Sequence, residues 1–534
     1  MSSYSKPTLI ERGEASAQIG EASPRIILLL SLFFVLPLLP YLVTALRLHY
    51  TAYNNSSDTF IYFDIARNFA QGRGLVLSFN PYQYWESVFY PAMPFVHVGF
   101  SIFLSLLYFF LPSIQKLIYF NFIFAFINTW LIYLIVKKIF SDRALAAWVG
   151  CILAASVSME ITLLRLLTEQ LSLFVTLVSI CLFVSKEELN RRDLFVIGVL
   201  LGIGFLIRAS SIVYPLAFFL AVFFARKRPA FKLAEFSLIL WPLVIAVSYA
   251  ALIYLRYGAM FPEYPKAFHN YYTATFITGG GFFAQQPVIR AVMKNSLDTV
   301  YFLNMRDMFL VLFCIVRVLL FFAIARFFNI FKTRKKDELL LFWLSFVAAV
   351  STLLFYRYNI VAEFQWTRFL LLPVVCLLAL GAAGLRDTAQ RFLPKTRRLF
   401  FHMVLFIIFV SNFYQSWRVL EVYWKKDEAR EWVASLDTVY QWVRINIAPA
   451  DTVAVSLFLL GRVYLERPTV ILPQHKALNF ENLRNFLLIY KPKAVIFENT
   501  MPLRFELDLA RFGYKKAVSS PLGGVFWVFV PSAS

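Results

Sequence analysis

Charged residues are scarce in this sequence. Only 16% of its 534 residues are Asp, Glu, Lys or Arg, whereas 60% are hydrophobic and 18% are aromatic. Soluble globular domains contain about 25% charged and about 45–50% apolar residues. The composition therefore excludes an ordinary soluble fold and predicts a chain that crosses a membrane several times.

Cysteine is also rare in this sequence. Several common sequence motifs are absent as well. The four cysteines lie inside apolar runs, without CxxC spacing or histidine partners, which argues against a disulfide framework or a zinc site. No internal repeat or low-complexity tract is visible. The C-terminal region has no glycine-rich phosphate loop and no nucleophile elbow. These absences remove the most common soluble catalytic architectures.

Acidic residues are fewer than Lys and Arg residues, so the net charge is +21. The basic residues occur in short clusters between apolar segments, as in cytoplasmic loops beside anionic lipid, and we therefore expect a bilayer and no nucleic acid as partner. The polar tail at residues 1–25 is too long for the n-region of a signal peptide, and no cleavage site follows the first apolar run. We expect that run to be retained as a membrane span.

The basic clusters predict a topology. A span needs about 20 apolar residues, and Lys/Arg-rich loops stay in the cytoplasm, so an even number of crossings should separate neighbouring clusters. The stretch 93–111 is then expected to lie on the outer surface or to dip part-way into the membrane, because it begins with prolines and a histidine. About eleven crossings remain, at 26–47, 117–136, 144–163, 168–185, 194–209, 210–225, 233–255, 309–331, 338–357, 369–385 and 399–415.

This topology gives a polytopic α-helical membrane protein with a small C-terminal α/β domain. We expect a cytoplasmic tail at 1–25, a transmembrane region at 26–415 that includes an external loop at 48–116, and an extracytoplasmic domain at 416–534. In the last region, strand-like DTVAVS, PTVIL, KAVIFE and GVFWVFV alternate with helix-like segments. The expected role of this domain is to cover the site or recognise an acceptor.

Two aspartates in SDTFIYFDIARNFAQGRG, residues 57–74, follow the first span closely. Asp58 stands where a helix should begin, so it could simply cap the helix. Asp64 could form a surface pair with Arg67 and Asn68, three and four residues further on, and it is the second choice as a functional acid. The GRG sequence at 72–74 predicts the end of the helix.

Ionisable side chains also interrupt the outer ends of predicted spans. Arg165 and Glu169 lie one helical turn apart and could merely pair with each other. Arg208 and Arg368 are predicted on the same side, although each could snorkel to the interface. Together, the carboxylates and arginines suit a substrate that carries phosphate on a membrane lipid, because arginine binds phosphate bidentately and a carboxylate accepts a hydroxyl proton.

At these residues the sequence resembles a known family. DTFIYFDIARNFAQGRG resembles the first external loop of the GT-C superfamily of polyprenyl-phosphate-sugar-dependent glycosyltransferases, in which an acid precedes a Y-x-x-x-A-R-N-x-x-x-G-x-G-like helix. YPAMPFVHVGFSIFLSLLYFF is similar to its proline-led helix, and WTRFLLLPV to its R-Y-L-L-P element. The stretch from KKIFSDR to SICLF, residues 137–183, is similar to its paired spans around an R-x-x-x-T-E or equivalent acidic motif. The resemblance covers residues 26–385 and is strongest to the protein-mannosyltransferase-like branch, with lipid A aminoarabinose transferases and lipopolysaccharide glycosyltransferases.

The resemblance implies roles for individual residues. Asp58 matches the catalytic acid of the first loop, and Glu169 matches the second-loop acid. The resemblance implies an inverting transfer to a lipid, glycan or protein acceptor in a bacterial cytoplasmic membrane. Thr59 replaces the second acid of many relatives, and Phe369 a common tyrosine, so a divalent ion such as Mg²⁺ or Mn²⁺ on Asp58 and Glu169 is not firmly implied. The family has basic residues that face the lipid-phosphate site, and their positions match Arg165, Arg208 and Arg368.

Two other readings remain open on the sequence alone. A polytopic transporter would also bury charges, although transporter repeats are not visible and the ionisable residues gather at one face instead of the midplane. A degenerate relative could bind a lipid-linked sugar without turning it over. Turnover that depends on Asp58 would separate the enzyme from both alternatives.

Overall fold

A computed structural model describes most of the chain. The described residues are 24–47, 57–77, 79–80, 98–156, 159, 162–164, 168–226, 232–257, 310–358, 371–425, 438–455, 467–472, 480–498, 503–519 and 526–532.

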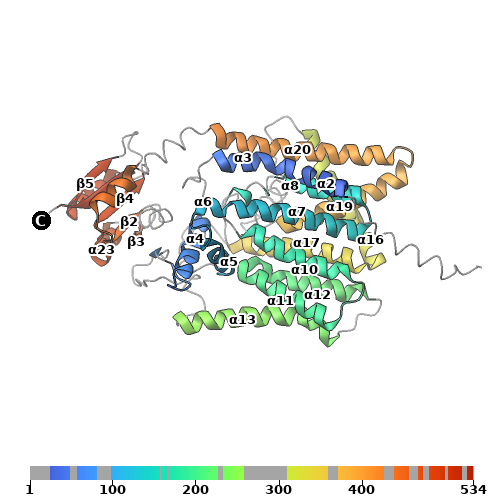
Figure 1. Cartoon of the computed structure of the whole chain (residues 1–534), viewed down its shortest axis with the longest axis horizontal. Helices are drawn as coiled ribbons and strands as arrows, with labels where there is room; N and C mark the ends of the chain where they lie inside the picture. Colours follow the sequence, from blue (N-terminus) through green and yellow to red (C-terminus); the bar gives the residue numbers. More distant parts are fainter. Residues whose placement is uncertain are drawn as a thin grey trace, which may run out of the picture.

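Long apolar helices form a bundle at the positions of the predicted spans (Figure 1). The first consists of α2 (Pro24–Val35), the short η1 (Leu36–Leu38) and α3 (Leu39–Arg47). The others are α7 (Tyr119–Phe140), α8 (Arg143–Ala154), α10 (Glu169–Ser185), α11 (Arg191–Ile207), α12 (Tyr214–Ala225), α13 (Ser237–Tyr257), α16 (Leu310–Thr333), α17 (Lys336–Tyr358), α19 (Leu371–Phe392) and α20 (Arg397–Lys425).

Not all of these helices meet the length expected of a span. Within the described ranges, five helical segments are both long and apolar enough to cross a membrane: Arg25–Leu46, Tyr119–Phe140, Leu233–Leu255, Leu371–Phe392 and Arg397–Tyr414. Others, such as α8 and α10, are apolar but shorter. The chain therefore has a multi-span helical architecture, while the number of eleven crossings stays a prediction.

The stretch expected not to span forms the short helix α5 (Gly99–Tyr108). Its 10 residues rise about 15 Å, half of a hydrocarbon core that is about 30 Å thick. It packs against α4 (Ser57–Ala70) and α11. The approach to α11 requires a glycine, because a Cβ on Gly99 would lie 2.6 Å from the backbone of Leu206.

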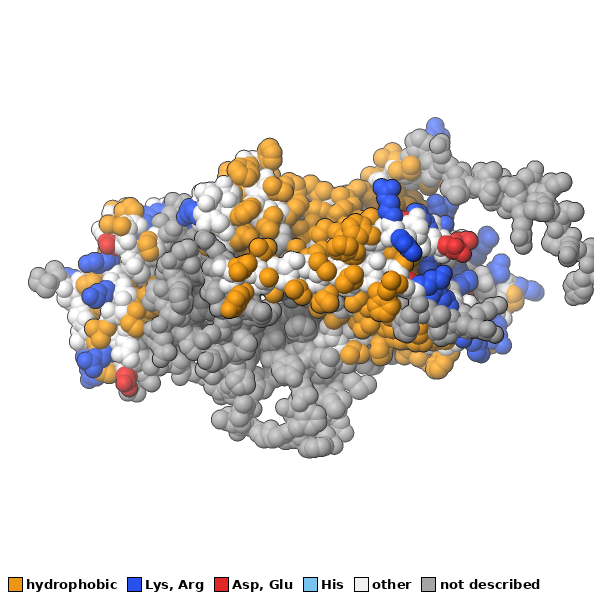
Figure 2. Space-filling view, turned by 90° about the horizontal axis from the view of Figure 1, so that it is seen from below, with side chains coloured by type: hydrophobic (Ala, Val, Ile, Leu, Met, Phe, Trp, Pro, Cys, Tyr) orange, Lys and Arg blue, Asp and Glu red, His pale blue; other side chains and the backbone are white. Residues whose placement is uncertain are grey.

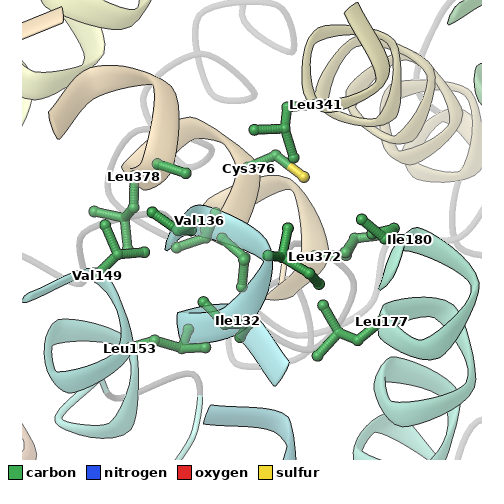
Figure 3. Close-up of a cluster of buried hydrophobic side chains, with 14 of the residues drawn as sticks. Ile132, Val136, Val149, Leu153, Leu177, Ile180, Leu341, Leu372, Cys376 and Leu378 are labelled. Carbon is green, nitrogen blue, oxygen red and sulfur yellow. The ribbon is translucent and has the colours of Figure 1, made fainter. Parts of the chain in front are cut away.

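The bundle core includes many aliphatic side chains from α7, α8, α10, α17 and α19, together with residues of the other bundle helices. Figure 3 shows Ile132 and Val136 of α7 among residues of the neighbouring helices, with Leu372 and Cys376 of α19 beside them. Helix α19 also approaches α16 closely, since a Cβ on Gly381 would lie 2.5 Å from a backbone oxygen of α16. Small residues allow such close approach of membrane helices.

The described part of the C-terminal region contains a mixed sheet and the helices α23 (Phe480–Tyr490) and α24 (Leu503–Arg511). The strand order is β1-β3-β2-β4-β6-β5, parallel from β1 to β4 and antiparallel beyond. Strands expected from the sequence are present as β2 (Val453–Val455), β3 (Thr469–Ile471), β4 (Ala494–Glu498) and β6 (Phe526–Pro531). Two further strands were not expected from the sequence: β5 (Tyr514–Ser519) and β1 (Phe79–Asn80), which comes from the first loop.

The two ends of the bundle carry different side chains. At one end, Figure 2 shows Lys and Arg side chains gathered beyond a band of hydrophobic ones. Ion pairs join helix ends there: Arg386 of α19 lies 3.3 Å from Asp142, which precedes α8, and Arg326 of α16 lies 2.9 Å from Glu338 of α17. We call this the basic end. Helix α4 and the sheet lie at the opposite end (Figure 1), which we call the site end.

Candidate active site

Helix α4 carries both aspartates of the first loop. It begins at Ser57, so Asp58 is the second helical residue and lies two residues beyond the cap position expected for it. The side chain of Asp58 lies outside the described part of the structure. The helix ends at Ala70, and Gly72 and Gly74 follow with φ of 76° and 89°, a backbone region that favours glycine. The predicted helix stop is therefore confirmed.

Asp64 is buried, contrary to the expected surface pair. Arg67 Nη2 donates to Asp64 Oδ1 at 2.8 Å, and Asn68 Nδ2 lies 3.4 Å from Asp64 Oδ2. The partners are those predicted, but Asp64 and Asn68 are almost fully buried and Arg67 is 8% exposed. Asn68 Nδ2 also donates to the carbonyl of Val76 at 2.9 Å. This cluster ties α4 to the segment that leads to β1, so its evident contribution is structural.

Glu169 and Arg208 form a buried ion pair between α10 and the end of α11. Arg208 Nη1 lies 2.7 Å from Glu169 Oε1, with the two side chains 12% and 1% exposed. Arg208 also donates from Nε to Ser210 Oγ at 2.9 Å and from Nη1 to Thr168 Oγ1 at 3.0 Å. Arg208 therefore turns inward to a carboxylate, and the alternative of snorkelling to the interface is wrong for this residue.

This ion pair lies beside α4. Tyr62, Phe63 and Ala66 of α4 share a hydrophobic cluster with Leu171 and Ile207. Leu171 is two residues beyond Glu169, and Ile207 immediately precedes Arg208. The helix that carries the aspartates thus shares a hydrophobic cluster with residues next to the ion pair, and its main contact is with α5, which also packs on α11.

Other predicted site residues cannot be placed in the same way. Arg165 and Arg368 lie outside the described residues, and so does the alternative pair between Arg165 and Glu169. Across the described ranges, no group of three or more His, Cys, Asp or Glu side chains is arranged to hold a metal ion. Metal binding by Asp58 and Glu169 stays a prediction.

The hydroxyl groups that bind Arg208 were not expected from the sequence. Thr168 and Ser210 are next to, or within two residues of, the charged partners. The signal was present in the sequences LTE and RASS, because polar residues inside apolar segments find partners among themselves. It was weak, since serine and threonine in membrane helices often bond only to their own backbone.

Comparisons with known proteins agree with this fold. Residues 96–255 match a family model described as dolichyl-phosphate-mannose-protein mannosyltransferase, a range that includes Glu169 and Arg208 but not α4. No curated protein matches the chain in sequence. The structure is similar to ArnT from Cupriavidus metallidurans bound to undecaprenyl phosphate, with 12% identity and a TM-score of 0.58 over 96% of this chain and 99% of that one.

A second similarity extends to archaea. Archaeal oligosaccharyltransferase AglB from Archaeoglobus fulgidus, in complex with an inhibitory peptide and a dolichol-phosphate, aligns with a TM-score of 0.50 and 12% identity over 92% of this chain and 74% of that one. At such identities, the structural likeness concerns the fold. The family-model match and the shared fold together confirm the resemblance to the GT-C superfamily of glycosyltransferases that the sequence motifs indicated.

Proposed function

We propose that this chain is a membrane glycosyltransferase that moves a sugar from a polyprenyl phosphate to an acceptor hydroxyl on the external face, with inversion at the sugar carbon. The observation that carries the proposal is the buried Glu169–Arg208 pair packed beside α4, at the end of the bundle away from the basic clusters. An acid and a phosphate-binding cation at one membrane face are what this reaction needs.

The reaction assigns a role to each group. The Asp58 carboxylate accepts the proton of the acceptor hydroxyl as its oxygen bonds to the anomeric carbon. The bond from that carbon to the phosphate oxygen breaks, and its electron pair leaves with the lipid phosphate. Arg208, held by Glu169, stabilises the anionic leaving group, and Arg165 and Arg368 are proposed to help. Inversion follows from a single displacement.

Two comparisons support a lipid phosphate as the carrier of the donor sugar. One similar structure, ArnT, is bound to undecaprenyl phosphate, and the other, AglB, is in complex with a dolichol-phosphate and an inhibitory peptide. We propose that this chain also takes its sugar from a lipid phosphate, with a lipid, glycan or protein as acceptor. The basic end is proposed to face the cytoplasm, because Lys and Arg favour that side. The site end, with the sheet, then lies outside.

The test is turnover of a polyprenyl-phosphate sugar by the purified protein in lipid nanodiscs. Asp58→Asn should lower kcat by about 10²- to 10⁴-fold, because the general base is lost. Glu169→Gln should weaken both catalysis and binding of undecaprenyl phosphate, since Arg208 loses the charge that orients it. Glu187→Gln, the same chemical change at an exposed acid of the basic end, serves as the matched control and should leave turnover unchanged.

Each rival function makes a different prediction in this assay. A binding protein would hold the lipid-linked sugar without releasing it, and a transporter would move a solute across vesicles without cleaving any donor. Turnover that is equal in the wild type and in Asp58→Asn would refute the assignment of the base. Absence of turnover across a panel of donor sugars, with intact lipid binding, would refute the transferase.

A further inference from the structure

A network of buried polar side chains includes Gln170, which directly follows Glu169 in the first turn of α10. Gln170 is fully buried, and its Nε2 donates to Thr162 Oγ1 at 2.6 Å. Asn128 Nδ2 of α7 reaches both the side-chain oxygen of Gln170, at 3.1 Å, and its backbone carbonyl, at 3.0 Å. Asn128 and Thr162 are also fully buried. The first turn of α10 is therefore bonded to two other segments.

The same network fastens the segment that precedes α10. Thr162 Oγ1 donates to the carbonyl of Met159 at 2.9 Å, and Asn121 Nδ2 donates to the carbonyl of Thr162 at 3.2 Å. Asn121 and Asn128 are separated by about two turns of α7, so they lie on one face of that helix. Helix α7 thus bonds both to Thr162, in the connection between α8 and α10, and to Gln170, in the first turn of α10.

The position of these groups suggests more than bundle stability. Interhelical hydrogen bonds in membranes contribute little stability on average. Gln170, to which Asn128 and Thr162 are bonded, directly follows Glu169, which with Thr168 contacts Arg208. The hydrogen bonds of this network restrict the geometry of the groups attached to it, although Asn128 Oδ1 is buried without a hydrogen-bond partner among the described residues.

We propose that Gln170, with Asn128 and Thr162, is a positioning device that holds Glu169 and Arg208 in register with α4 during sugar transfer. This inference rests on the proposed function and adds residues that do not touch the substrate. Its physical basis is that a displacement of about 1 Å in a reacting group can cost about 10²-fold in rate. Gln170 acts through Glu169, its neighbour in the chain.

Two substitutions at Thr162 test this role. Thr162→Val keeps the shape but removes the hydroxyl that Gln170 requires, whereas Thr162→Ser keeps the hydroxyl and loses a methyl group. We expect kcat to fall about ten- to a hundredfold in Thr162→Val, with the donor KM changed little, and to remain near wild type in Thr162→Ser. Hydrogen exchange of the backbone amides in the first turn of α10 should accelerate in Thr162→Val alone.

Thr129→Val is the matched control. Thr129 is fully buried on α7 beside Asn128, but its hydroxyl donates to the carbonyl of Ala125 in its own helix, at 2.8 Å. This variant should keep wild-type kcat and exchange. The inference is overturned if Thr162→Val behaves like Thr129→Val, or if Thr162→Ser loses as much rate as Thr162→Val, which would indicate packing. Without turnover in the wild type the proposed function fails, yet the exchange comparison still decides whether the network holds α10.

Discussion

The two ends of the helical bundle use buried charge in different ways. At the basic end, Arg326 contacts both Glu338 and Asp387, and Arg386 joins Asp387 to Asp142. The chain of contacts runs from α16 through α17 and α19 to the turn before α8. At the site end, Glu169 and Arg208 pair beside α4.

We propose that the charges at the basic end stabilise the fold, whereas the pair at the site end takes part in the chemistry. At the basic end, charges bind helix termini: Lys336 Nζ donates to the carbonyls of Phe183, Lys186 and Glu187, at and beyond the last turn of α10, whose carbonyls lack partners within the helix. At the site end, the Glu169–Arg208 pair lies beside α4, which carries Asp58 and Asp64. Substitutions at the two ends should therefore divide between stability and turnover.

The largest expected effect on stability is at Arg326. Arg326→Leu leaves Glu338, which is 3% exposed, without its buried cation. Removing one partner of a buried pair costs about 3–5 kcal/mol in the free energy of unfolding. Thermal unfolding in detergent should shift accordingly, while kcat measured well below the transition should stay at the wild-type value.

Lys335→Ala is the control for that change. Lys335 lies 3.8 Å from the same Glu338 carboxylate, but its side chain is 65% exposed. Such a pair contributes at most about 1 kcal/mol. A large loss of kcat in Arg326→Leu, with unfolding unchanged, would contradict the division between the two ends.

A smaller effect is expected at Asp64, where the site end contains a buried pair of its own. Asp64→Asn keeps the size of the side chain but removes the charge that Arg67 contacts. We expect the free energy of unfolding to fall by about 1.5–3 kcal/mol, the range for hydrogen bonds to charged groups. Wild-type stability together with a turnover loss comparable to that of Asp58→Asn would instead identify Asp64 as a functional acid.

The smallest effect is expected in the sheet, at Tyr514 of β5. Its hydroxyl donates to the carbonyl of Pro492 at 2.7 Å, and burial raises the pKa of Tyr514 to about 12. Because the folded-state pKa is raised, this stabilisation is complete below about pH 10, the ordinary tyrosine pKa, and is lost as the pH rises through about 12. Tyr514→Phe should cost about 1 kcal/mol at neutral pH and remove this alkaline dependence.

Hydrogen exchange of the β5 and β6 amides measures this change within the intact protein. Turnover should not respond, because β5 is at the edge of the sheet opposite β1. A clear loss of kcat in Tyr514→Phe would mean that the sheet as a whole, and not only its β1 edge, is coupled to the site end.

The helices could be predicted from the sequence because each depends on local composition. Apolar runs flanked by Lys and Arg place the spans, and helices such as α16 and α17 begin and end within two residues of the predicted segments. The pairing of Glu169 with Arg208 could not be predicted, since only Arg165 lies within one helical turn of Glu169 in the sequence. The partner is supplied by the packing of α10 against α11.

The burial of Asp64 and the short strand β1 were missed for similar reasons. The spacing of Asp64, Arg67 and Asn68 predicts their contacts but cannot show that α5 and its neighbours cover that face of α4. Strand β1 has two residues and no periodicity of its own. It becomes a strand only through pairing of Phe79 with Thr469 and Asn80 with Val470.

That pairing has a consequence for how the protein is made. Phe79 emerges from the ribosome early, whereas Thr469 follows only after nearly the whole chain has been synthesised. The outermost parallel strand must therefore join after the membrane helices exist, a non-local step of the kind that slows folding. A fragment that begins after α20 would carry β3 as an uncovered edge, open to pairing with other molecules.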